Sequence, residues 1–127
     1  MSANFLHTMV RITDPDRSRA FYEALGFEER RRAPIRDEAI NVFMSLPDDG
    51  PEPKLELTYN FGVDSYELGT AYGHIAIAAP DLDATLARLK EQGIEPERPP
   101  YTVSAGGNRL CFVRDPDNYR VEIIERS

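Results

Sequence analysis

The chain has 127 residues, 41% of them hydrophobic and 29% charged, a composition typical of a globular domain. Its formal charge of -7 argues against a nucleic-acid-binding protein, because a phosphate-binding surface needs a local excess of Lys and Arg. No apolar stretch is long enough to span a membrane, and a single cysteine excludes an internal disulfide. We therefore expect a cytoplasmic protein with neither nucleic acid nor membrane as a partner.

The first half of the chain predicts a strand, a helix and three further strands. Residues 5–13 alternate between apolar and polar side chains, which indicates a strand with two different faces. Asp14 and Pro15 are typical of a helix start, and Gly26 is typical of a helix end. Further strands are expected at residues 27–31, 39–46 and 54–59.

The second half repeats this order of elements. Residues 73–79 alternate as a strand, Asp81 begins a helix and Gly93 ends it. Further strands are expected at residues 94–98, 109–114 and 119–125. The chain thus contains two modules, at about 5–60 and 73–125. Each module is too small to be stable alone, so we expect the two to pack together as one domain of residues 1–127, within the chain or across a dimer.

The only two histidines of the chain occupy equivalent places in the two modules. His7 and His74 lie in the first strand of each module, while Glu56 and Glu122 lie between apolar residues in the last strand. The spacing of His7 and Glu56 differs by one position from the spacing of His74 and Glu122. In each strand the apolar neighbours are expected to face the helix, which leaves the imidazole and the carboxylate on the opposite face.

Two more polar side chains are expected on that face of module one. Alternation along the strands puts Arg11 beside His7 and Asn60 beside Glu56. The imidazoles and carboxylates themselves have three interpretations: a divalent metal site, metal-free acid–base chemistry, or histidines that end strands and glutamates that face water. The repetition of both residue types at equivalent positions favours the metal site.

The motifs also resemble those of the glyoxalase I family. The matching segments run from His7 to Glu125 and comprise residues 7–12, 21–27, 55–64, 69–76, 112–117 and 119–122. The resemblance implies the vicinal oxygen chelate fold, an α+β fold of two paired βαβββ modules with curved mixed sheets around a metal cavity. It also implies a lyase, lactoylglutathione lyase, which isomerises the methylglyoxal–glutathione hemithioacetal to S-lactoylglutathione through an enediolate and so detoxifies methylglyoxal.

The same resemblance implies a metal site shared between subunits. One divalent metal per site would be held by His7 and Glu56 of one subunit and by His74 and Glu122 of the other, in a homodimer with shared active sites. The short chain is similar to the compact forms activated by nickel or cobalt, and zinc is possible with the same ligands.

Roles for individual residues follow from the resemblance as well. Glu122 matches the principal catalytic base, and Glu56 matches a second group that carries a proton. Arg11 and Asn60 match positions that bind glutathione.

The chain departs from the family pattern in two places. Asn118 stands where the family usually has Gly in a turn, and Asn tolerates the left-handed backbone that such a turn needs. The loop at 101–108 resembles the glycine-rich substrate loop without reproducing it, so no substrate role is assigned there and Arg109 is only a possibility.

Two alternatives remain open within the same fold. The first is a metalloprotein that uses another thiol, such as trypanothione or bacillithiol, or that acts in fosfomycin-type resistance. The second is a non-enzymatic protein that binds a small molecule. Fosfomycin resistance proteins usually have two histidines and one glutamate, and bleomycin-binding proteins lack metal ligands, so the full set of His7, Glu56, His74 and Glu122 favours glyoxalase I.

Overall fold

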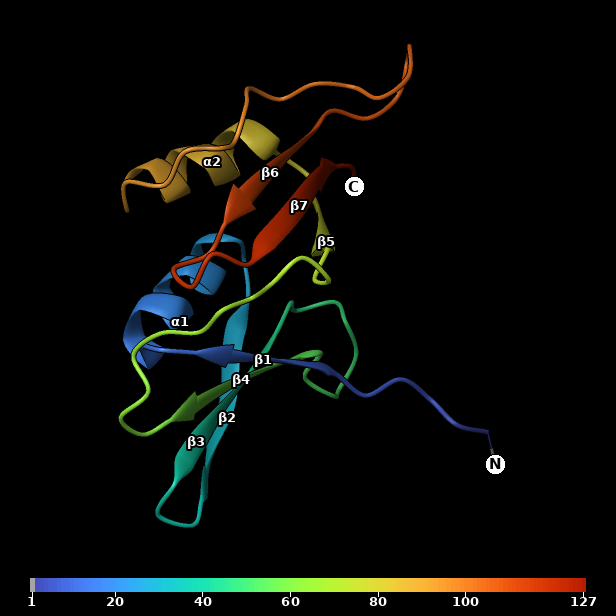
Figure 1. Ribbon diagram of the computed structural model, residues 1–127. Coiled ribbons are helices and arrows are strands. Elements are labelled where there is room, and N and C mark those ends of the chain that lie inside the picture. Colours follow the sequence, from blue (N-terminus) through green and yellow to red (C-terminus); the bar gives the residue numbers. More distant parts are fainter. Residues whose placement is uncertain (1) are drawn as a thin grey trace. The chain divides into compact units, whose positions relative to one another are not determined.

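The computed structural model describes residues 2–127 and consists of two compact units, the first ending at Tyr66 and the second starting at Glu67. In chain order the elements are β1 (Thr8–Ile12), α1 (Pro15–Ala24), β2 (Glu28–Ile35), β3 (Ala39–Ser45), β4 (Leu55–Asn60), β5 (His74–Ala79), α2 (Leu82–Lys90), β6 (Leu110–Arg114) and β7 (Arg120–Glu125). Each unit thus begins with a strand and a helix, and the predicted α+β class is confirmed (Figure 1).

The first unit holds a four-stranded mixed sheet in the order β1-β4-β3-β2, with β1 parallel to β4 and the other pairs antiparallel. Helix α1 begins where the sequence predicts, because the Asp14 carboxylate accepts hydrogen bonds from the backbone N–H groups of Asp16 and Arg17. Its apolar side buries Phe21 and Tyr22 almost completely. The aromatic side chains of this helix thereby supply much of the core of the unit.

The second unit holds a three-stranded sheet in the order β5-β7-β6, with β5 parallel to β7 and β6 antiparallel to it. Helix α2 begins at the Asp81 cap and buries Leu82 and Leu89. Within residues 2–127, neither helix is both long and apolar enough to cross a bilayer.

The expected strand at residues 94–98 is wrong, and with it the expectation of four strands in the second sheet. The segment follows β6 only at isolated points: the Glu97 N–H donates to the Phe112 carbonyl, and Tyr101 forms a single bridge with Leu110. Prolines at 96, 99 and 100 have no N–H to donate, so a continuous ladder cannot form there.

Strand register in the first unit decides which side chains share a face. Glu56 of β4 pairs with Met9 of β1 and with Phe43 of β3. Its neighbours Leu55 and Leu57 point to the opposite face and are buried. The predicted assignment of the carboxylate to the face away from the apolar core is therefore confirmed for this strand.

The second unit repeats this register. Glu122 of β7 pairs with Ala76 of β5 and with Phe112 of β6. Val121 and Ile123 on either side are fully buried on the other face. In both units a glutamate at the centre of the sheet thus has a phenylalanine directly opposite on the antiparallel neighbour.

Candidate functional site

The first unit brings His7 and Glu56 together. His7 lies immediately before β1, and parallel pairing of β1 with β4 brings its Nε2 to 3.6 Å from Glu56 Oε2. The His7 ring stands edge-on to Phe43 at 6.3 Å, and the Arg31 guanidinium lies 3.9 Å from the centre of the same phenyl ring. The Glu56 side chain is 15% exposed and the His7 side chain 34%, so the imidazole is the more accessible partner.

Glu56 has a further neighbour that the sequence did not suggest as a site residue. Asn41 of β3 donates a hydrogen bond from Nδ2 to Glu56 Oε1 at 3.3 Å. The Thr58 hydroxyl in turn donates to Asn41 Oδ1 at 2.8 Å. The signal available in the sequence was a single amide among the apolar residues of 39–46.

The second unit brings His74 and Glu122 together in the same way. His74 begins β5, and its Nε2 lies 3.2 Å from Glu122 Oε1. The His74 ring stands edge-on to Phe112 at 5.0 Å, and the Arg120 guanidinium lies 4.0 Å from the centre of that phenyl ring. Arg120 also donates two hydrogen bonds to Glu97, which hold the pKa of the Glu97 carboxyl below its ordinary value.

Arg11 and Asn60 lie on the sheet face that carries Glu56. Arg11 of β1 pairs with Thr58 of β4, and its side chain is exposed. Asn60 ends β4 and donates from Nδ2 to the Tyr66 hydroxyl at 3.0 Å. An exposed cation and an oriented amide therefore stand on the same side of the sheet as the carboxylate.

Arg109 has a structural role in the second unit. Its guanidinium donates to Glu125 at 3.0 Å and to Asp83 at 3.1 Å. Glu125 also accepts from the Leu82 N–H at the start of α2, at 2.9 Å. These contacts tie the end of β7 to the first turn of α2 and account for the cation that the sequence left unassigned.

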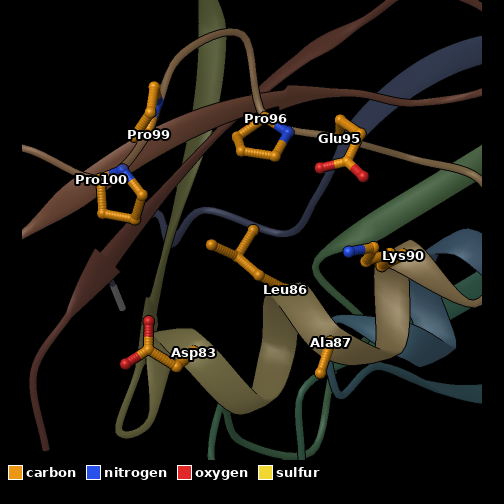
Figure 2. A pocket seen from close by; sticks show the side chains of 8 residues that line it. All are labelled: Asp83, Leu86, Ala87, Lys90, Glu95, Pro96, Pro99 and Pro100. Atoms are coloured by element: carbon orange, nitrogen blue, oxygen red, sulfur yellow. The ribbon is translucent and has the colours of Figure 1, made fainter.

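A pocket of about 380 Å³ lies between α2 and the chain segment that follows it (Figure 2). Its apolar lining comes from Leu86 and Ala87 of the helix and from Pro96, Pro99 and Pro100. None of the site residues expected from the sequence lines this pocket.

The two pairs have the donor types and spacing that a divalent metal needs. Two ligand atoms that each lie 2.0–2.2 Å from one ion, at angles of about 90–120°, are about 2.8–3.8 Å apart. The separations of 3.6 Å in the first pair and 3.2 Å in the second both fall in this range. No group of three or more His, Cys, Asp or Glu side chains suited to a metal occurs within residues 2–127, so each unit offers a pair of donors.

Comparison with known proteins gives the family. The model of the Glyoxalase/Bleomycin resistance protein/Dioxygenase superfamily matches residues 4–123. The chain belongs to this superfamily. Within it, the chain is 42% identical over 122 residues to a lactoylglutathione lyase of Haemophilus influenzae, covering 94% of this chain and 90% of that protein. The resemblance to glyoxalase I in the sequence motifs is thereby confirmed.

Solved structures of this superfamily confirm the predicted fold. Glyoxalase I of Zea mays, as the V278E mutant, aligns with a TM-score of 0.86 at 38% identity, covering 97% of this chain and 44% of that one. The trypanothione-dependent glyoxalase I of Leishmania major aligns with a TM-score of 0.81 at 37% identity, covering 98% of this chain and 87% of that one.

The chain differs in length from some of these glyoxalase relatives. A lactoylglutathione lyase of Arabidopsis thaliana is 39% identical over 127 residues, but the chain covers only 44% of it. The chain thus spans less than half of the plant relatives that it matches.

Proposed function

We propose that this protein is a metal-dependent lactoylglutathione lyase, which isomerises the methylglyoxal–glutathione hemithioacetal and so detoxifies methylglyoxal. One observation carries the proposal: each of the two units holds a His–Glu pair on the sheet face away from its buried core, at 3.6 Å and 3.2 Å. Relatives named lactoylglutathione lyase support the reaction.

We propose that the two pairs complete one metal site, in a homodimer with shared active sites. His7 and Glu56 of one subunit would join His74 and Glu122 of the other around a single divalent ion, and in each chain the two units would form one glyoxalase domain of residues 1–127. A pair of donors is fewer than the three or four protein ligands usual for a catalytic metal, which supports the joining of two pairs. Nickel or cobalt is favoured, with zinc possible.

The chemistry required of this chain is the transfer of one proton between adjacent carbons. When bound, the metal acts as a Lewis acid that stabilises negative charge developing on the substrate oxygens. Glu122 takes the proton from C1 of the hemithioacetal and returns it to C2, and Glu56 moves a proton on the other side. No redox partner is needed, because the aldehyde carbon is oxidised to a thioester as the neighbouring ketone becomes an alcohol.

Arg11 and Asn60 are proposed to bind the thiol cofactor. Glutathione carries carboxylates, and in a protein of charge -7 it needs a local cation. Arg11 is exposed on the face of Glu56, and the Asn60 amide, at the end of the Glu56 strand, donates to the hydroxyl of Tyr66 in the segment that follows.

A reducing compartment such as the cytoplasm is proposed for this reaction, because the substrate is built on a free thiol. The single cysteine is consistent with this location. Cys111 is buried, and burial raises its pKa to about 11, which makes it a poor nucleophile.

The test is isomerase activity on the methylglyoxal–glutathione hemithioacetal. Protein stripped of metal should be inactive and should regain activity when nickel, cobalt or zinc is added separately, with the order of activities identifying the preferred metal. Tight metal binding without activity would refute glutathione as the cofactor. Absence of metal binding would refute the metalloenzyme itself.

A second candidate is the same reaction with another thiol. The relative from Leishmania major is trypanothione-dependent and is 37% identical to this chain. Parallel assays with the hemithioacetals of glutathione, trypanothione and bacillithiol distinguish the two candidates by their kcat/KM values.

A further inference from the structure

The two oxygens of the Glu56 carboxylate have different partners. Oε2 lies 3.6 Å from His7 Nε2, while Oε1 accepts a hydrogen bond from Asn41 Nδ2 at 3.3 Å. Asn41 is itself held by Thr58, whose buried hydroxyl donates to Asn41 Oδ1 at 2.8 Å. Because Asn41 and Thr58 are directly opposed on β3 and β4, this hydroxyl–amide–carboxylate relay lies across one sheet face.

The hydrogen-bonding capacity of each group fixes the direction of the relay. An ionised carboxylate only accepts hydrogen bonds, so Asn41 must present its NH₂ group to Glu56. The amide oxygen of Asn41 then faces Thr58 and needs a donor, which the hydroxyl provides. Rotation of the amide by 180° would set oxygen against carboxylate, so the Thr58 hydrogen bond holds Asn41 in the orientation that serves Glu56.

The second unit is an internal control for this relay. Phe112 is opposite Glu122 as Phe43 is opposite Glu56. Two residues further along these antiparallel strand pairs, on the same face, Leu110 is opposite Ile124, where the first unit has Asn41 opposite Thr58. The equivalent antiparallel strand pair of the second unit therefore forms with two apolar side chains at this position. The polar pair Asn41–Thr58 is thus not required to build the sheet of the first unit.

The two glutamates consequently differ in restraint. Oε1 of Glu56 is held by the relay, while Oε2 lies 3.6 Å from the His7 imidazole. Glu122 lies 3.2 Å from the His74 imidazole and near the charge of Arg120, and within residues 2–127 no side-chain amide donates to it.

We propose that Asn41, oriented by Thr58, is a positioning residue that fixes the Glu56 carboxylate. A carboxylate that binds a metal is held in place when its second oxygen is hydrogen-bonded. The consequence for the metal rests on the proposed function, but the restraint on Glu56 does not.

The restraint is tested first on the metal-free protein. Two-dimensional ¹H–¹⁵N spectra should show the Asn41 side-chain amide protons shifted from the positions of exposed amides and protected from exchange with water. Thr58→Val should abolish the shift and Thr58→Ser should restore it, because serine keeps the donor. Glu56→Gln should move the same signals. Asn41 signals at exposed positions that none of these changes affects would overturn the proposal, whether or not the protein is an isomerase.

The consequence for the metal is tested with the double variant Asn41→Leu/Thr58→Ile, which gives the first unit the apolar pair of the second. Loss of a group that orients a metal ligand typically lowers metal affinity by about 10–100-fold, and a decrease of that size is expected for Ni²⁺ measured by competition with a chelator. The free energy of unfolding, measured with urea, checks that the variant is folded.

A matched control is Thr85→Val, which removes another buried threonine hydroxyl, one bonded to Asp81 and Arg88 in α2. It should leave Ni²⁺ affinity unchanged. Wild-type affinity in the folded double variant would overturn the proposal. Wild-type protein that binds Ni²⁺ but isomerises no hemithioacetal would refute the proposed function. The comparison of Ni²⁺ affinities would still test the role of Asn41.

Discussion

Glu122 and Glu56 have the same side chain, but only Glu122 is proposed to carry the proton between the two substrate carbons. Glu122→Gln keeps the size of the side chain and an oxygen for the metal, but the amide cannot accept a proton at neutral pH. We expect its kcat to fall by about 10²–10⁴-fold, the usual contribution of a general base. Steady-state kinetics on protein of measured metal content tests this.

The control for this change is Glu95→Gln, at an exposed residue of the pocket beside α2. It should leave kcat at the wild-type value. Glu122→Gln protein that retains metal and turns over at the wild-type rate would remove Glu122 as the base.

The residues of each His–Glu pair were predictable, while those that support them were not. Alternation of apolar and polar residues placed Glu56 and Glu122 on the open face, since a strand has a period of two. The role of Asn41 depends on which residue of β4 lies opposite it. That register is set by the pairing of two strands and their connecting loop rather than by the pattern within one strand.

The turn between β6 and β7 depends on one residue with a left-handed backbone. Asn118 has a φ of 76° there, as its sequence context predicts, and its N–H donates to the Asp115 carbonyl at 2.9 Å. Asn118→Ala should lower the free energy of unfolding by about 1–2 kcal/mol, because a Cβ without a polar group is disfavoured in this region. Urea unfolding measures the change.

Asn118→Gly is the matched substitution for this turn. It should keep most of the wild-type stability, since glycine adopts the same backbone without strain. An alanine variant as stable as wild type would show that the turn relaxes to another conformation.

The link between β7 and α2 makes stability depend on pH. Hydrogen bonds from Arg109, and after them the Leu82 N–H, hold the pKa of Glu125 below its ordinary value of 4.5. A carboxyl with a lowered folded-state pKa contributes stability above its unfolded pKa and loses that contribution as the pH falls through the folded value. Urea midpoints should therefore separate wild type from Glu125→Gln at pH 7 and converge as the pH falls below 4.5 and through that lowered pKa.

Glu52→Gln, a change at an exposed residue of the loop before β4, is the control for this titration. It should follow the wild-type curve at every pH. A constant difference between Glu125→Gln and wild type from neutral to acid pH would show that Glu125 stabilises the unit by packing rather than by charge.

At the scale of elements, both helices and most strands were predictable, because Asp caps, terminal glycines and alternation are local signals. The exception was the segment at residues 94–98. Its apolar residues were compatible with a strand, but a strand also needs N–H groups to donate to its neighbour. Prolines at 96, 99 and 100 interrupt the donors, so this part of the chain bonds to β6 through the separate N–H groups of Glu97 and Tyr101.

The whole molecule is a pair of units, each carrying half of the proposed ligand set. The internal repeat was predictable because the two histidines and two glutamates recur in the same order at nearly the same spacing. Which His–Glu pairs would share one metal depends on how the subunits assemble, and the residue pattern within a strand carries no information about assembly. Homodimers of this kind are symmetric, so every site built from two subunits has a counterpart with the roles exchanged.

This symmetry gives a test by mixing inactive variants. In a heterodimer of His7→Ala and His74→Ala subunits, one shared site loses both histidines and the other keeps all four ligands. Random re-association should therefore restore about one quarter of the wild-type activity, because half of the dimers are heterodimers and half of their sites are intact. Activity is measured on the mixture after metal loading, with heterodimers identified by a mass or affinity tag.

The matched control mixes His7→Ala with Glu56→Ala. Both changes fall in the same half of the ligand set, so each site of a heterodimer contains one damaged half and no activity should return. Recovery in the first mixture alone supports sites shared between subunits, because only that mixture is able to rebuild a complete ligand set. If heterodimers form and neither mixture recovers, both pairs of one site belong to the same chain, and the dimer would have no role in holding the metal.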